Sequence, residues 1–297
     1  MSFSRWRDTG AHFHFNGHDI FYQRHGAGET ALLLIHGFPT ASWDFEPVWN
    51  GLCERFEHVL APDLLGFGFS AKPKRHRYSL LEQADLCEQL LARYEVRRVH
   101  VLAHDYGVSV AQELLARQLE RPEREATILS TVLLNGGLFP ETHRPTGAQK
   151  LLKSPLGPLL AALMNERAFG RAFSRVFGPR TRPTPIELHD FWRLITFNDG
   201  QRVIPRLLRY IDERRAQRSR WVGALTHTTV PLRLINGAED PVSGAHMARR
   251  YAELVPDADI VSLEGIGHYP QFEAPDRVLR AVLDFHRRRV TSAPSGA

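Results

Sequence analysis

Three ionisable side chains in this 297-residue chain each follow a run of apolar residues, and together they could carry out nucleophilic chemistry. Asp105 stands in AHDYG, Asp240 in NGAEDPV and His268 in GIGHYPQFE. Each has a simpler interpretation, since aspartate often caps a helix or closes a turn, and a lone histidine is usually only a hydrogen-bonded polar residue. A carboxylate nucleophile, an acid and a histidine base would instead form a catalytic triad, in which the acid orients the histidine.

The pattern of apolar residues predicts the strands and helices that must hold these side chains. Two alternating segments, 11–17 and 19–26, predict a β-hairpin with its turn at Asn16-Gly17. Continuous apolar runs predict buried strands within 31–37, 58–66, 99–107, 131–137, 230–240 and 258–268. Amphipathic helices are predicted at 80–94, 108–119 and 276–288. Because strands and helices alternate, we expect an α/β fold, a mostly parallel eight-stranded sheet with helices on both faces.

The alternation fails between residues 139 and 224, where helical pieces, prolines and glycines replace the strand patterns. We expect this segment to be a helical cap over the carboxyl ends of the strands, where open α/β sheets bind ligands. The core would then comprise residues 1–138 and 225–297. Residues 291–297, TSAPSGA, predict a disordered tail.

The segment AHDYG matches a nucleophile elbow, a sharp turn from strand to helix with the pattern small-x-nucleophile-x-glycine. Asp105 occupies the place of the nucleophile, and Ala103 stands where glycine is usual. Asp105, Asp240 and His268 each follow a strand, in the chain order nucleophile, acid and base that an α/β-hydrolase triad requires. We therefore predict that these three residues are catalytic.

The segment HGFP follows the third predicted strand, where the same fold places a loop that helps to bind an oxyanion. We expect the backbone N–H groups of Phe38 and Tyr106 to form this oxyanion hole. His36 and Pro39, together with Trp192 of the cap, are predicted to contact the substrate. The aromatic residues of the cap could equally form its own core.

These motifs resemble those of the carboxylate-nucleophile branch of the α/β-hydrolase superfamily, which contains epoxide hydrolases and haloalkane dehalogenases. The similar segments span nearly the whole chain: HGFP, DLLGFGFS, HDYG, the late aspartate and GHYPQFE. Within that branch the chain is most similar to the mesoderm-specific transcript protein group, in HGFPTASWDF, LGFGFSAKP, HDYGVSVAQELL, GGLFPETHRP, VFGPRTRP and RRAQRSRWVGAL. The resemblance implies the α/β-hydrolase fold and an alkyl-enzyme ester, formed by Asp105 at saturated carbon and hydrolysed by water that His268 activates.

The leaving group distinguishes the two activities. Haloalkane dehalogenases resemble one another in binding the halide with the side-chain N–H groups of an Asn or Trp after HG and of a Trp after the nucleophile. Here those two positions hold Phe38 and Tyr106, whose side chains have no N–H group. Epoxide hydrolases use two cap tyrosines to protonate the opening ring, and the predicted cap contains one, Tyr210. Three alternatives follow from the missing second tyrosine. Tyr210 acts alone, another donor such as His143 or His189 replaces the second tyrosine, or the reaction is not epoxide opening. We expect an epoxide hydrolase acting on a small apolar epoxide, with a haloalkane dehalogenase-like hydrolase as the alternative.

A function of another class also fits, because a fold with this triad can serve as a non-catalytic ligand-binding or receptor protein. As partners we expect a small apolar organic substrate and water, with no cofactor and no metal, in a monomer or homodimer. The net charge of +5 and the basic run 213–220 predict a solvated basic face rather than nucleic-acid binding. No apolar run is long enough to span a membrane, so we expect no membrane contact. Two cysteines without metal-ligand or CxxC spacing, and an N-terminus without the apolar region of a signal peptide, lead us to expect a cytoplasmic protein.

Overall fold

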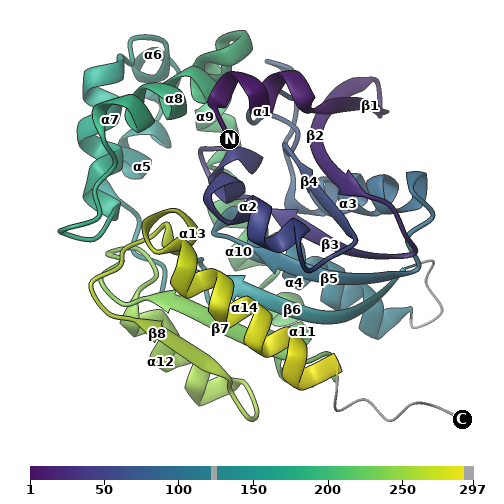
Figure 1. Cartoon of the computed structure of the whole chain (residues 1–297). Coiled ribbons are helices and arrows are strands. Elements are labelled where there is room, and N and C mark those ends of the chain that lie inside the picture. The colour runs from purple at the N-terminus through teal and green to yellow at the C-terminus, as the bar shows by residue number, and fades with distance from the viewer. Residues whose placement is uncertain (122–125, 291–297) are drawn as a thin grey trace, which may run out of the picture.

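One eight-stranded sheet forms the centre of the computed structural model, which describes residues 1–121 and 126–290 (Figure 1). Its strands are β1 Ala11–Phe15, β2 His18–Gly26, β3 Thr30–Ile35, β4 His58–Pro62, β5 Arg98–Ala103, β6 Thr127–Leu134, β7 Leu232–Gly237 and β8 Ile260–Leu263. They lie in the order β1-β2-β4-β3-β5-β6-β7-β8. β1 and β2 are antiparallel to their neighbours and the other pairs are parallel, which confirms the predicted sheet. The predicted disordered tail, 291–297, lies outside the described residues.

The central strands are buried on both faces, as continuous apolar sequences predict for parallel strands. Every residue of β4 is buried, and so is every residue but the first in β3 and β5. The β1–β2 hairpin turns at Asn16 and Gly17, whose φ angles of 47° and 83° lie in the left-handed region that an Asn-Gly turn requires. Because the strands from β3 to β8 are parallel, their carboxyl ends meet at one edge of the sheet. The buried central strands give this edge a rigid base.

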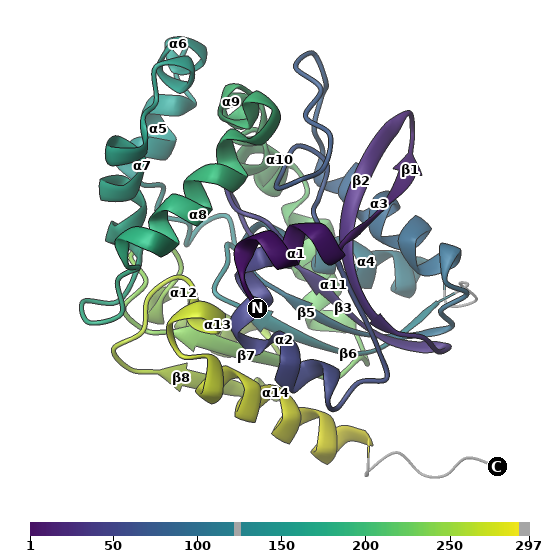
Figure 2. The same cartoon turned by 45° about the horizontal axis from the view of Figure 1, so that its top comes forward.

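Helices cover both faces of this sheet (Figures 1 and 2). On one face α2 (Glu46–Cys53) packs against α14 (Pro275–Val290), and on the other α4 (Tyr106–Glu120) packs against α3 (Leu80–Arg93) and α11 (Arg218–His227). The shorter helices around the core are α1 Phe3–Thr9, η1 Ser42–Phe45, α12 Ala245–Leu254 and α13 Pro270–Glu273. None of the described helices combines the length and the apolar character needed to cross a membrane.

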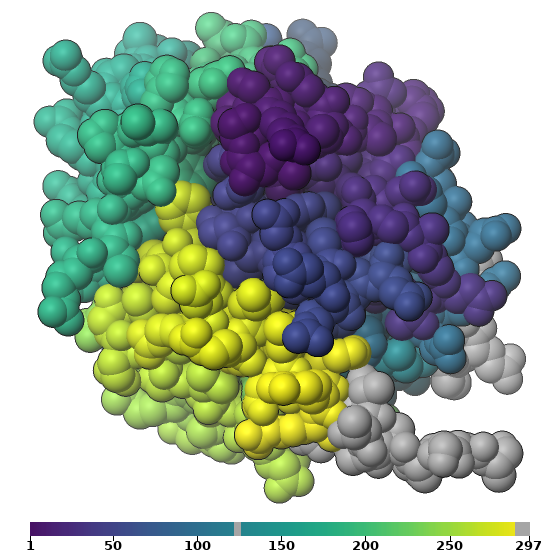
Figure 3. All heavy atoms as spheres, viewed as in Figure 1, coloured from purple at the N-terminus to yellow at the C-terminus, as the bar shows by residue number. Residues whose placement is uncertain are grey.

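A helical insertion between β6 and β7 stands over one end of the sheet (Figure 1). Its helices are α5 Gly147–Leu152, α6 Gly157–Ala162, α7 Glu166–Phe173, η2 Ser174–Val176, α8 Pro185–Thr196, η3 Phe197–Val203, α9 Ile204–Leu207 and α10 Tyr210–Ala216. Arg193 of α8 stacks on Phe3 of α1 at 4.5 Å, and the N–H of Gly178 donates to Glu273 of α13 at 2.8 Å. Accordingly, the teal insertion rests against purple α1 and yellow α13 in the space-filling view (Figure 3).

The helix that precedes β7, α11, belongs with the sheet. It packs along α4, and Trp221 Nε1 donates to the buried carboxylate of Glu113 in that helix at 2.8 Å. Residues 218–224 thus lie against the core, although the sequence assigns them to the cap. We propose that the cap ends before Arg218.

Candidate active site

Asp105 occupies the sharp turn between β5 and α4. Its φ of 44° and ψ of −100° are unfavourable for a residue with a side chain, and such a conformation persists only where the surroundings hold it. Its N–H donates to the carbonyl oxygen of Asn135 at 2.8 Å. At Gly107 a Cβ would lie 2.2 Å from the carbonyl oxygen of Ile35, so a side chain cannot be accommodated there. The backbone around AHDYG therefore has the geometry of an elbow that presents the Asp105 carboxylate.

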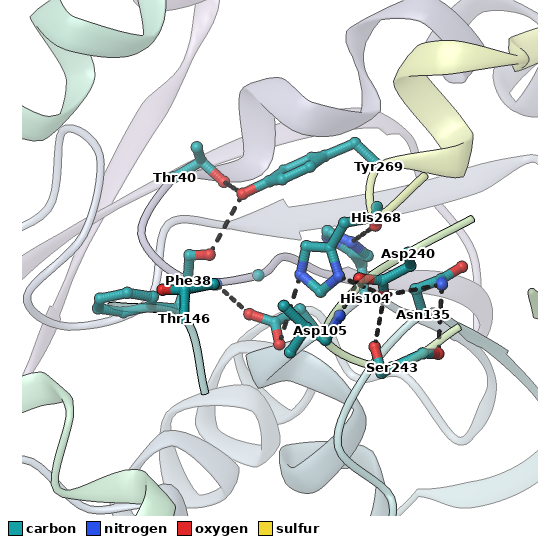
Figure 4. Close-up of polar contacts among 12 residues, drawn as sticks. Phe38, Thr40, His104, Asp105, Asn135, Thr146, Asp240, Ser243, His268 and Tyr269 are labelled. Carbon is teal, nitrogen blue, oxygen red and sulfur yellow. Dashed lines mark hydrogen bonds and ion pairs between the residues drawn. The ribbon is translucent and has the colours of Figure 1, made fainter. Parts of the chain in front are cut away.

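His268 lies between the carboxylates of Asp105 and Asp240 (Figure 4). Its Nδ1 is 2.7 Å from Asp240 Oδ2, and its Nε2 is 3.7 Å from Asp105 Oδ1. Asp240 follows β7 and His268 follows β8, and all three side chains are buried. The structure thus brings together the three residues that the sequence predicts as a triad.

The Asp240 carboxylate is held by several hydrogen bonds. Besides His268, its Oδ2 accepts from Asn135 Nδ2 at 2.9 Å and from Ser243 Oγ at 2.7 Å. Its Oδ1 accepts from the N–H of Val242 at 2.7 Å. Because Nδ1–H of the histidine donates to this carboxylate, Nε2 is directed into the site. Asp240 is therefore placed to orient the histidine and not to attack a ligand.

The loop after β3 brings the backbone of Phe38 to the Asp105 carboxylate (Figure 4). Its N–H donates to Asp105 Oδ2 at 3.0 Å, and its carbonyl oxygen accepts from the Tyr269 hydroxyl at 3.2 Å. The N–H of Tyr106 opens α4, and the first N–H groups of a helix have no partner within it. The N–H of Phe38 thus meets Oδ2, and Oδ1 is the oxygen that faces the histidine.

The mutual contacts of the triad residues determine their charges. Burial raises the pKa of Asp105, but the hydrogen bond and charge of His268, with the charge of Arg214, outweigh it and hold that pKa well below its usual value. Burial lowers the pKa of His268, whereas the neighbouring carboxylates of Asp240 and Asp105 raise it to about 10. Burial raises the pKa of Asp240 too, and His268 lowers it on balance. The two carboxylates therefore favour the protonated form of His268, and the histidine in turn favours their ionised forms.

Arg214 lies directly behind the elbow, and sequence reasoning missed it. Its side chain is 2% exposed, so the prediction of a solvated basic face is wrong at this position. Nη2 donates to the Asp105 carbonyl oxygen at 2.8 Å and lies 3.9 Å from Oδ1, while Nε donates to Ser109 Oγ at 2.7 Å. The guanidinium also stacks on the ring of Tyr210 at 4.5 Å. The one available signal was its position a helical turn after this tyrosine, on the same face of α10.

Asn135 was also missed, although the signal was stronger. It follows β6 directly, at the end of the apolar run TVLLNGG, where the other site residues also follow their strands. Its Oδ1 accepts from the N–H of Gly237 at 2.6 Å, its Nδ2 donates to Asp240, and its carbonyl oxygen accepts from Asp105. Asn135 therefore links the elbow to the loop that carries the acid.

A cavity of about 350 Å³ adjoins Asp105 and His268, between the sheet edge and the insertion. The core lines it with Phe38, Pro39, Asp105, Val242, His268 and Tyr269, and the insertion with Thr146, Ala148, Gln149, Leu151, Leu152, Leu160, Leu163, Met164, Ala168, Phe169, Ala172, Phe173, Val176 and Ile204. The wall is thus largely apolar and suits an apolar ligand. Within residues 1–121 and 126–290 there is no group of three or more histidine, cysteine or acidic side chains that could hold a metal ion.

The predicted substrate contacts differ in position. Pro39 lines the cavity. His36 does not, because both of its ring nitrogens form hydrogen bonds with backbone atoms, at 2.8 and 2.9 Å, and brace the loop. Trp192 packs behind Phe169, with the ring centroids 5.8 Å apart, in the insertion's own core. The alternative interpretation of the cap aromatics therefore describes Trp192 better than substrate contact does.

The three predicted proton donors lie outside the cavity wall. His189 is exposed and pairs with a glutamate at 2.9 Å. The ring nitrogens of His143 are buried, and burial, helped by the charge of Arg214, lowers its pKa to about 4. Tyr210 is 2% exposed, and its hydroxyl accepts a hydrogen bond from Gln149 Nε2 at 3.3 Å.

Comparisons with known proteins confirm the resemblance. Residues 32–281 match the alpha/beta hydrolase family. The mesoderm-specific transcript protein of Mus musculus is 46% identical over 290 residues, which cover 94% of this chain and 86% of that protein. Haloalkane dehalogenase DbeA from Bradyrhizobium elkani USDA94 has a TM-score of 0.79 at 21% identity, over 96% of this chain and 99% of its own. Epoxide hydrolase CorEH has a TM-score of 0.76 at 20% identity, over 94% and 99%. This chain belongs to the alpha/beta hydrolase family.

Proposed function

We propose that this chain forms an alkyl ester on Asp105 and hydrolyses it with water, and that its substrate is a small apolar epoxide. The observation that carries the proposal is the buried carboxylate in an elbow conformation, facing a histidine that a second carboxylate holds. Attack of a carboxylate on a carbonyl would give an unstable anhydride, which disfavours ordinary esterase chemistry. Attack on saturated carbon gives a stable ester.

In the first step Asp105 attacks through Oδ1, because Oδ2 accepts the N–H of Phe38. The new carbon–oxygen bond forms as the ring carbon–oxygen bond breaks, and the electron pair moves to the ring oxygen. That oxygen then takes a proton from His268, directly or through a water molecule. The histidine carries this proton at rest, because its pKa is raised to about 10.

Ester formation itself prepares His268 for the second step. Once Asp105 is an ester, one of the two carboxylates that raise the histidine's pKa is gone, and the imidazole stays neutral. It takes a proton from the water that attacks the ester carbonyl, and the N–H groups of Phe38 and Tyr106 stabilise the oxyanion at Oδ2. Collapse passes that proton to the departing alkoxide, and the new carboxylic acid returns its proton to His268.

Two features support an epoxide and a role for the insertion as a cap. A halide leaves as a stable anion, whereas an alkoxide needs a proton, which the resting imidazolium can supply. The insertion contributes the apolar side of the cavity, so it would exclude bulk water from the ester and select apolar substrates.

The test is to trap the ester in the His268→Gln variant. This variant is mixed with styrene oxide, 1,2-epoxyhexane or 1-bromohexane, and the intact protein is weighed by mass spectrometry. We expect a lasting adduct with the full mass of the epoxide, because water replaces His268 as proton source for ring opening but nothing replaces it as base for ester hydrolysis. The double variant Asp105→Asn/His268→Gln is the control and should stay unmodified.

Two outcomes would contradict the epoxide proposal. An adduct of the hexyl group from 1-bromohexane, without any epoxide adduct, would favour a dehalogenase. No adduct from any of the three compounds, alongside measurable binding of one of them, would favour a ligand-binding protein.

A further inference from the structure

The part of the cavity wall that the insertion contributes is nearly devoid of polar side chains. Among its described lining residues, Thr146 and Gln149 alone have polar side chains, and the others end in carbon or sulfur. In the proposed reaction negative charge develops on the ring oxygen, and a hydrogen-bond donor there would lower the barrier. Tyr210 does not line this wall, so the donor is to be sought on α5 and its N-cap.

The orientation of the Gln149 amide is determined by the start of helix α5. Thr146 caps this helix: its Oγ1 accepts from the Gln149 backbone N–H at 3.2 Å, and its own N–H donates to Gln149 Oε1 at 2.8 Å. This reciprocal pair is a capping box. Because the Thr146 N–H can only donate, the amide oxygen must be the atom that faces it. The amide nitrogen is therefore directed away from the helix start.

The amide nitrogen of Gln149 has one partner and a second hydrogen. Nε2 donates to Tyr210 Oη at 3.3 Å, and an amide nitrogen carries two N–H groups. Tyr210 in turn is fixed by its neighbours, with ring centroids 5.8 Å from Phe38 and 5.2 Å from Tyr106. The hydroxyl of this tyrosine thus holds the amide in position, while its ring packs against Phe38 and Tyr106.

We propose that Gln149, held by Thr146 and Tyr210, donates its second N–H to the ring oxygen as the epoxide opens. This inference rests on the proposed epoxide reaction. It explains how the site works without a second cap tyrosine, since the proton itself comes from His268 and the cap need only supply a neutral hydrogen-bond donor. The bond changes are those of the first step, and Gln149 gains and loses no atom.

The test measures how fast the ester forms when Gln149 is changed in the His268→Gln background, with styrene oxide as the probe. Gln149→Leu should slow adduct formation at saturating epoxide by about a hundredfold, the usual cost of one oxyanion-type donor. Gln149→Glu should slow it at least as much. Glutamate preserves the capping box, but an ionised carboxylate has no N–H to donate and repels the developing alkoxide.

A second capping box provides the matched control. Thr184 and Glu187 form the same reciprocal pair at the start of α8, and neither lines the cavity. Glu187→Leu in the His268→Gln background should form the adduct at the parent rate. Equal slowing by Glu187→Leu and Gln149→Leu would mean that helix capping alone matters, and would overturn the proposal.

The remaining outcomes separate this inference from the function it rests on. Adduct formation by Gln149→Leu and Gln149→Glu at the parent rate would overturn the role of Gln149 and leave the epoxide reaction standing. If the His268→Gln parent forms no adduct with styrene oxide or 1,2-epoxyhexane, the proposed function itself fails, and the role of Gln149 fails with it.

Discussion

The sheet edge and the helical insertion border the same cavity but are built in contrasting ways. At the sheet edge Asp240 accepts four hydrogen bonds, and Asp105 is bound through its N–H, its carbonyl oxygen and its carboxylate. In the insertion none of the residues of α5 is buried, and Leu156, Leu159 and Leu163 around α6 are 62%, 59% and 69% exposed. The carboxylates at the sheet edge are therefore fixed by contacts with several elements. The residues of α5 and the leucines around α6 remain partly or largely exposed.

This difference suggests that the sheet edge and the insertion have separate roles. The charges and directions of the ionisable groups depend on strand ends that the whole sheet holds, so the covalent chemistry should tolerate little change there. The insertion offers mostly carbon to a ligand, with one oriented amide at Gln149. Changes in the insertion should therefore alter which substrate reacts and how fast its leaving atom departs, while the ester chemistry persists.

The strongest test of the sheet edge is Asp240→Asn. Turnover of epoxide should fall about ten-thousandfold, because asparagine can present an N–H to Nδ1 and stabilise the wrong tautomer of His268. Ester hydrolysis should lose most, so adduct should accumulate on the variant, as mass spectrometry after rapid quenching can show. Ser243→Ala, which removes one donor to the same carboxylate, is the control and should cost about tenfold or less. Turnover by Asp240→Asn at the level of Ser243→Ala would contradict the orienting role.

Arg214→Met tests whether the sheet edge depends on this buried arginine, which belongs to α10 of the insertion. We expect a loss of about 3 kcal/mol in the free energy of unfolding, because the Asp105 carbonyl oxygen and Ser109 hydroxyl lose a buried charged donor. Urea unfolding followed by circular dichroism measures this. Arg218→Met is the control from the same basic run. Its partly exposed pair with Glu141 should contribute about 1 kcal/mol or less, and equal losses for both variants would contradict the distinction.

The sequence predicted best those features that local patterns determine. Parallel strands buried on both faces give continuous apolar runs, and groups at their carboxyl ends must converge, so the sheet and the proximity of Asp105, Asp240 and His268 followed from order and spacing. The elbow could be predicted from the sequence as well. A side chain at position 107 would collide with β3, so the motif contains a glycine there. The roles of these residues stay predictions until the adduct experiment is done.

The features that depend on packing between distant segments could not be read in this way. Arg214 looks like its exposed neighbours in a basic run, and only the docking of α10 behind the elbow buries it. Trp192 lies on an amphipathic helix, and periodicity cannot distinguish an insertion's own core from a cavity wall. Gln149 carried no signal beyond a capping box, since its relation to Tyr210 spans 61 residues.

The pH dependence of ester formation and of ester hydrolysis is the smallest effect that we expect. It also compares the sheet edge with the insertion most closely. Below neutrality ester hydrolysis should slow by about tenfold per pH unit once the medium is more acidic than the pKa of His268 in the ester, because the base becomes protonated. Ester formation should continue, because the pKa of Asp105 lies well below its usual value and the carboxylate stays ionised. Rapid quenching of the unmodified protein with styrene oxide should therefore reveal more adduct at pH 5 than at pH 8.

At the alkaline end the order reverses. The resting His268 loses its proton as the pH rises through about 10, so ring opening should slow there while hydrolysis of any ester formed does not. Gln149 carries no titrating proton, so Gln149→Leu should lower the whole profile of ester formation without moving its alkaline limb. If the limb disappears in Gln149→Leu, the proton reaches the ring oxygen through the insertion and not from the sheet edge, and the assignment of proton and hydrogen bond to separate regions is wrong.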